Sequence, residues 1–459
     1  MEVMGQKAGW MHATVTRDDD EIRTTNAMKM SVDRAGVELV IQVESTFAET
    51  LDGEGLWASA RTSFGGQDTL TTYQFLDDGV LQKVESGGQS TQTKLPPIQG
   101  VWLTPNETRA FMTDRLRAEA DTITVRTIDA SVGIQPVTIT YTKFEPTTLE
   151  LLGRTVRAIR CESSNSATPG ITSIEYLDEH GVPLRSEMNM GGMLITMVAA
   201  DRELATSDIA APELMTSLFI SPDKPIPGAR TLKRAAYLLR VPDGRLELPP
   251  QTGSQMVERV DEQTVRVRVC ADRFQPAGDV DVQACLERST MLDTEDTRLR
   301  ELHDQALEGA GEGKAERAEA LRRFVYRYIR KKGLGVGFAS ASEVARSCEG
   351  DCSEHGTLLA ALLRVDGIPS RVVSGVVYVD EFAGSKAIFG YHMWTQALLS
   401  IEGQLRWVDL DATLPGSLSY DATHIALGLS TLADGEVING LVSLAPLMGR
   451  LEISVESLD

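Results

Sequence analysis

The chain has 459 residues, of which 42% are hydrophobic and 24% are charged, an ordinary composition for a globular protein with two or three domains. Its 66 acidic residues outnumber its 45 basic residues, and the formal net charge is −21. A surface with this charge repels nucleic acid and anionic lipid head groups, so neither is an expected partner. No apolar run reaches the length of a transmembrane helix.

The first ten residues read as strand-like sequence and contain no apolar signal region. Since the amino half that follows is rich in β structure, we expect a periplasmic or secreted protein whose leader is absent from this chain. A cytoplasmic location is the alternative.

Alternation of apolar and polar residues dominates the first half of the chain. Strands are predicted over residues 37–47, 56–64, 122–128 and 137–144, with Gly, Asp and Asn clusters between them. A strand, an acidic turn and a second strand recur at 73–80 and 174–182, which suggests a duplicated sheet. Residues 176–193 resemble the curved sheets of bacterial cell-envelope proteins. We predict a β-rich curved-sheet domain over residues 1–215, with a binding or purely structural role.

A proline-rich segment at 221–227 interrupts the chain and is typical of a linker. Beyond it, residues 264–269 alternate strictly between valine and polar residues, the pattern of a half-buried strand. These features predict a small β module over residues 216–290.

The hydrophobic period then changes from that of a strand to that of a helix. Leu321, Phe324, Val325, Tyr328 and Ile329 recur at helical spacing, and charged residues occupy most of the other face. We expect this helix to open a third domain over residues 291–459.

Cys352 stands immediately before the apolar run 357–363 and is therefore predicted at the start of a helix. The unpaired N–H groups and the positive end of the helix dipole favour an anion there, which makes a thiolate easier to form. This is a suitable position for a nucleophile.

His392 and Asp411 follow in two predicted strands, 391–400 and 405–410, separated by the turn signal Glu402-Gly403. A hairpin brings such residues side by side. His392 would then take the proton from Cys352, and Asp411 would orient the imidazole, as an activated cysteine requires.

Two residues compete for these roles. His355 lies one helical turn after Cys352 and is an alternative base, although no carboxylate partner for it is evident. Asp409 points to the same face of a regular strand as Asp411, so geometry alone leaves the choice of carboxylate open.

Three motifs, each weak alone, together resemble the transglutaminase-like superfamily of papain-fold cysteine enzymes. They are Gly350-Asp351-Cys352 with the following 358–375 segment, His392-x-Trp394, and Trp407 with Asp411-Ala412-Thr413. The resemblance covers about residues 291–459 and selects Asp411. It implies a helix carrying the cysteine, packed on an antiparallel sheet that carries the histidine and the aspartate. Ala412 and Met393 depart from the residues usual in the family.

The predicted fold class is α+β, with a C-terminal transglutaminase-like (papain-like) domain preceded by antiparallel β-rich domains. The predicted function is thiol-dependent acyl transfer or hydrolysis on peptide or carboxamide substrates through Cys352, His392 and Asp411. The alternative is a catalytically inactive binding module of the cell envelope. No cofactor is expected.

Several side chains near these motifs receive structural or open assignments. Asp351 is expected to cap the helix, and Glu354 and Arg371 to line the site or to pair with each other. A metal site is not expected, because Cys348, Cys352 and His355 provide only three ligands close in sequence. Whether Cys270 and Cys285 form a disulfide, and whether Cys348 reaches Cys352, stays open. The backbone N–H of Cys352 is one oxyanion donor, and the second is unassigned.

Overall fold

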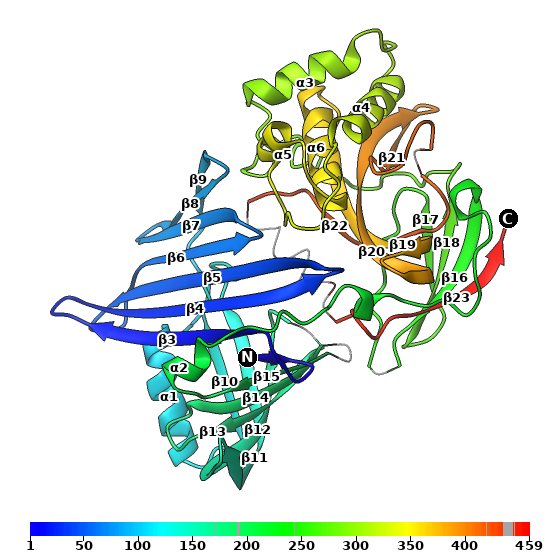
Figure 1. The fold of residues 1–459 in the computed structure, drawn as a ribbon. Coiled ribbons are helices and arrows are strands. Elements are labelled where there is room, and N and C mark those ends of the chain that lie inside the picture. The colour runs from blue at the N-terminus through cyan, green and yellow to red at the C-terminus, as the bar shows by residue number, and fades with distance from the viewer. Residues whose placement is uncertain (169, 191–192, 243, 419, 435–443, 445) are drawn as a thin grey trace. The chain divides into compact units, whose positions relative to one another are not determined.

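The computed structural model describes all residues except 169, 191–192, 243, 419, 435–443 and 445 (Figure 1). The chain forms two compact units. Unit 1 contains residues 1–85 and 90–213, and unit 2 contains residues 86–89 and 214–459. No helix among the described residues combines the length and the hydropathy needed to cross a bilayer.

Unit 1 is built from two antiparallel sheets in which most strands pair with their neighbours in sequence. The seven-stranded sheet has β3 to β9 in chain order, and the eight-stranded sheet has the order β10 to β15, β1, β2. The strands are β1 (Glu2–Val3), β2 (Gln6–Lys7), β3 (Gly9–Arg17), β4 (Glu21–Arg34), β5 (Val37–Thr50), β6 (Gly55–Phe64), β7 (Gln67–Leu76), β8 (Gly79–Ser86), β9 (Gln89–Leu95), β10 (Thr122–Thr127), β11 (Val137–Leu151), β12 (Arg154–Asn165), β13 (Thr172–Leu177), β14 (Pro183–Met190) and β15 (Met193–Val198).

Helix α1 (Pro105–Arg117) packs on the eight-stranded sheet through Met112, and a short helix α2 (Arg202–Ala205) follows β15. A capping box between Thr104 and Glu107 starts α1. The two segments that resemble each other in sequence form the hairpins β7–β8 and β13–β14, one in each sheet. The duplication itself stays a prediction.

Unit 2 contains two four-stranded antiparallel sheets and the helices α3 to α6 (Figure 1). One sheet has the strand order β21-β20-β19-β22 and the other β17-β18-β16-β23. The elements are the short 3₁₀ turns η1 (Thr216–Leu218) and η2 (Ala229–Thr231), β16 (Arg234–Arg240), β17 (Gln255–Arg259), β18 (Thr264–Cys270), α3 (Thr297–Leu307), α4 (Lys314–Tyr328), α5 (Ala341–Ser347), α6 (Cys352–Val365), β19 (Ser370–Phe382), β20 (Ser385–Ile401), β21 (Gln404–Leu410), β22 (His424–Ser430) and β23 (Glu452–Leu458).

Helix α6 is buried on nearly all of its sides, because its sequence after the first residues is apolar all round. Leu358 and Leu362 pack in one core with side chains from α3, α4 and α5 and with Val372, Ala397 and Leu399 of the sheet β19–β22. The opposite face of that sheet packs on the sheet β16–β18 in a second core. The sheet that carries the candidate site residues therefore lies between two cores, which fixes its strands.

These observations confirm the α+β class, since the helices of unit 2 pack on an antiparallel sheet and antiparallel β structure precedes them in the chain. The predicted helix at 321–329 belongs to α4, where Leu321 and Val325 are fully buried. The predicted boundary at 215/216 lies close to the division between the units at 213/214. The separate domains 216–290 and 291–459 stay a prediction, since both ranges fall within unit 2 and β16 pairs with the C-terminal strand β23.

The proline-rich segment 221–227 is attached to unit 2 and differs from the free linker expected from its sequence. The Ile226 side chain is fully buried in the second core, and its N–H donates to the Tyr378 hydroxyl at 3.1 Å. The Asp223 carboxylate accepts a hydrogen bond from the N–H of Val455 at 2.7 Å. The prolines prevent this segment from pairing as a β-strand. The buried Ile226 side chain and the two hydrogen bonds hold it on unit 2.

Replacing Ile226 by alanine should lower the free energy of unfolding of unit 2 by about 2–4 kcal/mol, because the substitution leaves a cavity in a closed core. Denaturant unfolding measures the change. Val260→Ala, at an exposed position of the same unit, should change it by less than about 0.5 kcal/mol. Equal effects of the two substitutions would mean that the segment is a linker after all.

Candidate active site

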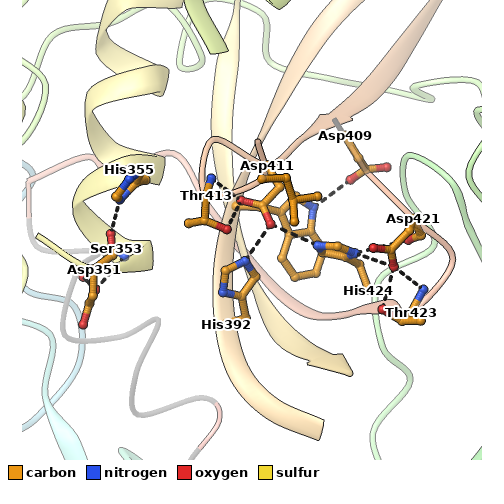
Figure 2. Close-up of polar contacts among 12 residues, drawn as sticks. Asp351, Ser353, His355, His392, Asp409, Asp411, Thr413, Asp421, Thr423 and His424 are labelled. Carbon is orange, nitrogen blue, oxygen red and sulfur yellow. Dashed lines mark hydrogen bonds and ion pairs between the residues drawn. The ribbon is translucent and has the colours of Figure 1, made fainter. Parts of the chain in front are cut away.

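Cys352 is the first residue of α6, as the sequence predicts, and its side chain is partly buried. The Asp351 carboxylate caps the helix and accepts from the N–H of Ser353 at 2.9 Å (Figure 2). Glu354 closes a capping box by accepting from the N–H of Asp351 at 2.8 Å. A Cβ at Gly350 would lie 2.2 Å from the Glu354 Cβ, so glycine is required there. The conformation around the cysteine is thus set by the helix start itself.

Glu354 is fully buried and connects two parts of the helical layer. Its Oε1 accepts from the N–H of Ala339, just before α5, at 3.0 Å. Burial, together with the charge of Asp351, raises the pKa of Glu354 to about 7. Glu354 therefore acts in the structure as a support for the start of α6.

His392 and Asp411 lie side by side, as predicted from the hairpin β20–β21. The distance between His392 Nε2 and Asp411 Oδ2 is 2.9 Å (Figure 2). Asp411 follows the last residue of β21, and its Oδ1 accepts from both the N–H and the hydroxyl of Thr413 at 2.7 Å. The carboxylate is thus held from one side while its other oxygen faces the imidazole.

Electrostatics in this pair favour the charged forms of both groups. Burial lowers the pKa of His392, but the charge and hydrogen bond of Asp411, with a smaller effect of Cys352, outweigh it and raise the pKa to about 9. Burial raises the pKa of Asp411, whereas His392 and His424 outweigh it and bring the pKa well below its usual value. The site stabilises an imidazolium beside a carboxylate.

Cys352 lies close enough to His392 to contribute, after Asp411, to the raised pKa of the imidazole. Since Nε2 faces Asp411, Nδ1 is the ring nitrogen left for the thiol. The structure therefore pairs His392 with Asp411 as expected, and a hydrogen bond from Cys352 to the same ring stays a prediction.

Asp409, the rival carboxylate, is buried and occupied elsewhere. Its oxygens accept from Trp394 Nε1 at 2.9 Å, from Gln396 Nε2 at 2.7 Å and from the N–H of Ser254 at 2.8 Å. Burial raises its pKa in spite of these bonds. Asp409 fixes the indole of Trp394, which stacks on His392 with ring centroids 6.2 Å apart.

His355, the rival base, makes a local contact within its own helix. Its Nδ1 lies 2.6 Å from the carbonyl oxygen of Asp351 (Figure 2). Burial lowers its pKa, in contrast to that of His392. The structure therefore favours His392 as the partner of the thiol.

Arg371 does not pair with Glu354, because each has other partners. The Arg371 guanidinium stacks on Trp407 at 3.8 Å and donates to Gln396 Oε1 at 3.0 Å and to Thr252 at 2.5 Å. Burial lowers its pKa to about 10. The predicted contact between the two residues is wrong, although their structural role is not.

His424 is a site residue that the sequence analysis did not identify. It begins β22, is fully buried, and places its Nε2 3.2 Å from Asp411 Oδ2 (Figure 2). A signal was available, since Asp421-Ala422-Thr423 directly before it repeats Asp411-Ala412-Thr413. In both copies the aspartate Oδ1 accepts from the N–H and the hydroxyl of the threonine.

The facing atoms of His392, Asp411 and His424 lie within 4.8 Å of one another, a composition and spacing that could surround a cation. In the structure the same atoms are joined by hydrogen bonds. These bonds account for the orientation of all three side chains, so we assign the cluster to proton-bearing contacts. Cys348, Cys352 and His355, which are close in sequence and were not expected to bind a metal, are not among the clusters that the described residues form.

All five cysteines lie in the described part of the chain, and none of them is in a disulfide. Cys270 ends β18, whereas Cys285 packs with Leu398 and Trp407 in a separate small cluster, and the two are not bridged. Cys348 is the C-cap of α5 in a left-handed conformation with φ 56°.

Residues 300–412 match the model of the transglutaminase-like superfamily, which confirms the resemblance found in the sequence. No curated protein matches the chain. Among solved structures, a candidate cysteine protease from Cytophaga hutchinsonii is 14% identical, with a TM-score of 0.28 over 50% of this chain and 84% of that one. A β-barrel-like protein of unknown function from Brucella abortus is 13% identical, with a TM-score of 0.27 over 42% of this chain and 98% of that one. A candidate protease from Parabacteroides distasonis is 12% identical, with a TM-score of 0.19 over 80% and 69%.

The raised pKa values of His392 and His424, both about 9, predict how stability depends on pH. Each group stabilises the fold fully below its unfolded pKa of about 6.5 and loses that contribution as the pH rises toward about 9. The free energy of unfolding should therefore fall across this window by more than about 1 kcal/mol. Asp411→Asn should flatten the decline, because both imidazoles lose their shared carboxylate.

Urea unfolding at several pH values between these limits measures the slope. Asp304→Asn, at an exposed carboxylate on α3, should keep the slope of the parent protein. A slope that is unchanged by Asp411→Asn would show that the two histidines do not owe their charge to Asp411.

Proposed function

Since residues 300–412 belong to a domain of the transglutaminase-like superfamily, we propose that this protein is a thiol enzyme that transfers or hydrolyses an acyl group of a peptide or carboxamide substrate. Cys352 is the nucleophile, His392 the general base and acid, and Asp411 the residue that orients the imidazole. The observation that carries the proposal is the 2.9 Å hydrogen bond between His392 and the buried Asp411 carboxylate, with Cys352 close enough to contribute to the raised pKa of the same imidazole.

The chemistry follows from this arrangement. His392 takes the proton of the Cys352 thiol, and the thiolate attacks the carbonyl carbon of the substrate. The resulting oxyanion lies beside the start of α6, where the Cys352 N–H is available as a donor. The imidazolium then gives its proton to the departing amine and leaves an acyl-enzyme. Water or a second amine, deprotonated by His392, attacks the thioester and releases the product and the thiol.

Asp411 supports both halves of the cycle. Its carboxylate stabilises the imidazolium while the thiolate exists, and it keeps Nε2 occupied so that Nδ1 exchanges protons with sulfur and substrate. Burial of Asp411 strengthens this effect, because solvent does not screen the pair.

Cys352→Ala should abolish labelling by a thiol-reactive activity probe and formation of an acyl-enzyme, while the melting temperature changes by only a few degrees, since the thiol is partly exposed and alanine suits a helix. Mass spectrometry of the labelled peptide identifies the cysteine. Cys270→Ala, in the same unit, should label as the parent protein does. A folded parent protein with an unreactive Cys352 would instead support the alternative, an inactive binding module.

His392→Ala should move the half-maximal alkylation of Cys352 to higher pH by about one unit or more, because the imidazolium partner is lost. His355→Ala should move it much less, since that ring bonds to the helix backbone. Iodoacetamide alkylation rates measured against pH decide between them. A larger displacement from His355→Ala would exchange the roles of the two histidines.

We also propose a location outside the cytoplasm, supported by the β-rich amino half. In such a compartment Cys352 has to stay reduced to react, and Cys348 is the thiol nearest to it in sequence. Disulfide mapping of protein made in an oxidising compartment, with assays before and after reduction, tests this. Five free thiols and an activity indifferent to reductant would count against it.

A further inference from the structure

Five side chains of alternating charge form a continuous hydrogen-bonded series behind the proposed nucleophile. It runs from His392 through Asp411, His424 and Asp421 to Arg230 (Figure 2 shows the first four). The contacts are 2.9 Å and 3.2 Å around Asp411 Oδ2, 3.3 Å from His424 Nδ1 to Asp421 Oδ1, and 2.6 Å from Arg230 to Asp421 Oδ2. The triad therefore continues beyond its carboxylate.

The partners of His424 determine its protonation. Nε2 faces the Asp411 carboxylate, and Nδ1 faces both the carbonyl and the carboxylate of Asp421. All of these oxygens accept hydrogen bonds when the aspartates are ionised, and none has a proton to give. Burial raises the pKa of Asp421, but His424, and after it Arg230 and Thr423, outweigh burial and lower that pKa, so the carboxylate is ionised. A ring with acceptors on both nitrogens satisfies them only as the doubly protonated imidazolium.

The surroundings of His424 keep this charge in place. Its ring lies 4.5 Å from Tyr420, 5.3 Å from Trp394 and 5.8 Å from His392, measured between centroids. The side chain is fully buried, so the two carboxylates are its counter-charges. Burial lowers the pKa of His424, but Asp421 and Asp411 outweigh it and raise the pKa to about 9.

We propose that His424 is a positioning residue of the proposed triad: as an imidazolium, it fixes Asp411 Oδ2 against His392 Nε2 and shares the negative charge of that carboxylate. The inference rests on the proposed function for its catalytic meaning. In physical terms, the Asp411 carboxylate is paired with two cations, His392 and His424. It therefore holds the proton on His392 less tightly than a carboxylate paired with His392 alone would.

This sharing has a use in a thiol enzyme. His392 has to hold a proton while the thiolate exists and then release it to the leaving amine. A buried carboxylate with no other partner would keep the imidazolium too firmly for rapid release. A second cation on the same oxygen weakens that attraction without moving the carboxylate, and Arg230 with Asp421 keeps the second cation charged.

The test removes the positive charge of His424 and keeps a hydrogen-bond donor in its place. In His424→Gln a neutral amide N–H takes the place of Nε2–H, and in Asp421→Asn the anion that holds the imidazolium is removed. Both should raise the pH at which His392 loses its proton, by about one unit for His424→Gln and by less for Asp421→Asn. The readout is ¹⁵N NMR of labelled histidine rings against pH, with the decline of the Cys352 alkylation profile at high pH as a second measurement.

The matched control is His303→Gln. His303 also lies between two carboxylates, Asp304 at 3.0 Å and Asp366 at 2.9 Å, and Arg317 pairs with Asp366. His303 and Asp304 lie in α3, and Asp366 directly follows α6, so these residues are not part of the site. This variant should leave the His392 titration and the alkylation profile unchanged. A merely structural role for His424 would lower the melting temperature in His424→Gln with no displacement of the His392 titration, and that result would overturn the inference.

The unmodified protein provides a further test that does not depend on any variant folding. Both ring nitrogens of His424 should carry protons from about pH 6 to about pH 8. A neutral His424 ring in this range would refute the proposal. If the His424 and His392 titrations behave as expected while Cys352 reacts only as an ordinary thiol, the proposed enzyme function fails and the positioning of Asp411 stands.

Discussion

The buried carboxylate of Asp411 is the contact on which the arrangement of the site depends. It accepts four hydrogen bonds, two from Thr413 and one from each of two imidazoles. An ionised group with no exposure is stable in a protein only if its charge is balanced and its lone pairs are satisfied. Asp411 meets both conditions, and in doing so it determines the orientation of His392 and His424.

The sheet that carries these residues is rigid because both of its faces are covered. The α6 face packs in one apolar core, and the other face packs on the sheet β16–β18 and β23. A one-residue slip of the β20–β21 register would turn His392 to the opposite face of the sheet, and burial of the strands opposes such a slip. The valines of β18 and the leucines of α6 therefore contribute to the geometry of the site, although none of them lies within it.

Helix α6 joins the chemistry to the core in a single element. Its apolar body requires burial, and its first turn has to remain open enough for a reactive side chain. The capping box of Asp351 and Glu354 makes both possible, since it satisfies backbone N–H groups at the start of the helix and leaves the Cys352 side chain free of that role. The raised pKa of Glu354, about 7, is a consequence of placing such a cap in the interior.

Local features of the sequence were enough to predict Cys352, His392 and Asp411 and the elements that carry them. A cysteine before an apolar helical run and two strands joined by a turn signal depend on spacing of a few residues, which sequence periodicity records. The order of the motifs and their resemblance to a family selected Asp411 over Asp409. The strands of the amino half were predictable for the same reason, because alternation is a local property.

Only the tertiary structure decided which distant groups meet. Arg230 is remote in sequence from Asp421 and His424. The repeated Asp-Ala-Thr does not by itself show that His424 meets Asp411 or that Arg230 meets Asp421. The anchoring of Ile226 and the pairing of β16 with β23 depend equally on contacts between remote parts of the chain. Sequence alone could specify many of the elements and indicate the candidate site residues, since both rest on short-range spacing. The electrostatic balance around the imidazole could not be read from it, because that balance is set by charges brought within a few ångströms by folding.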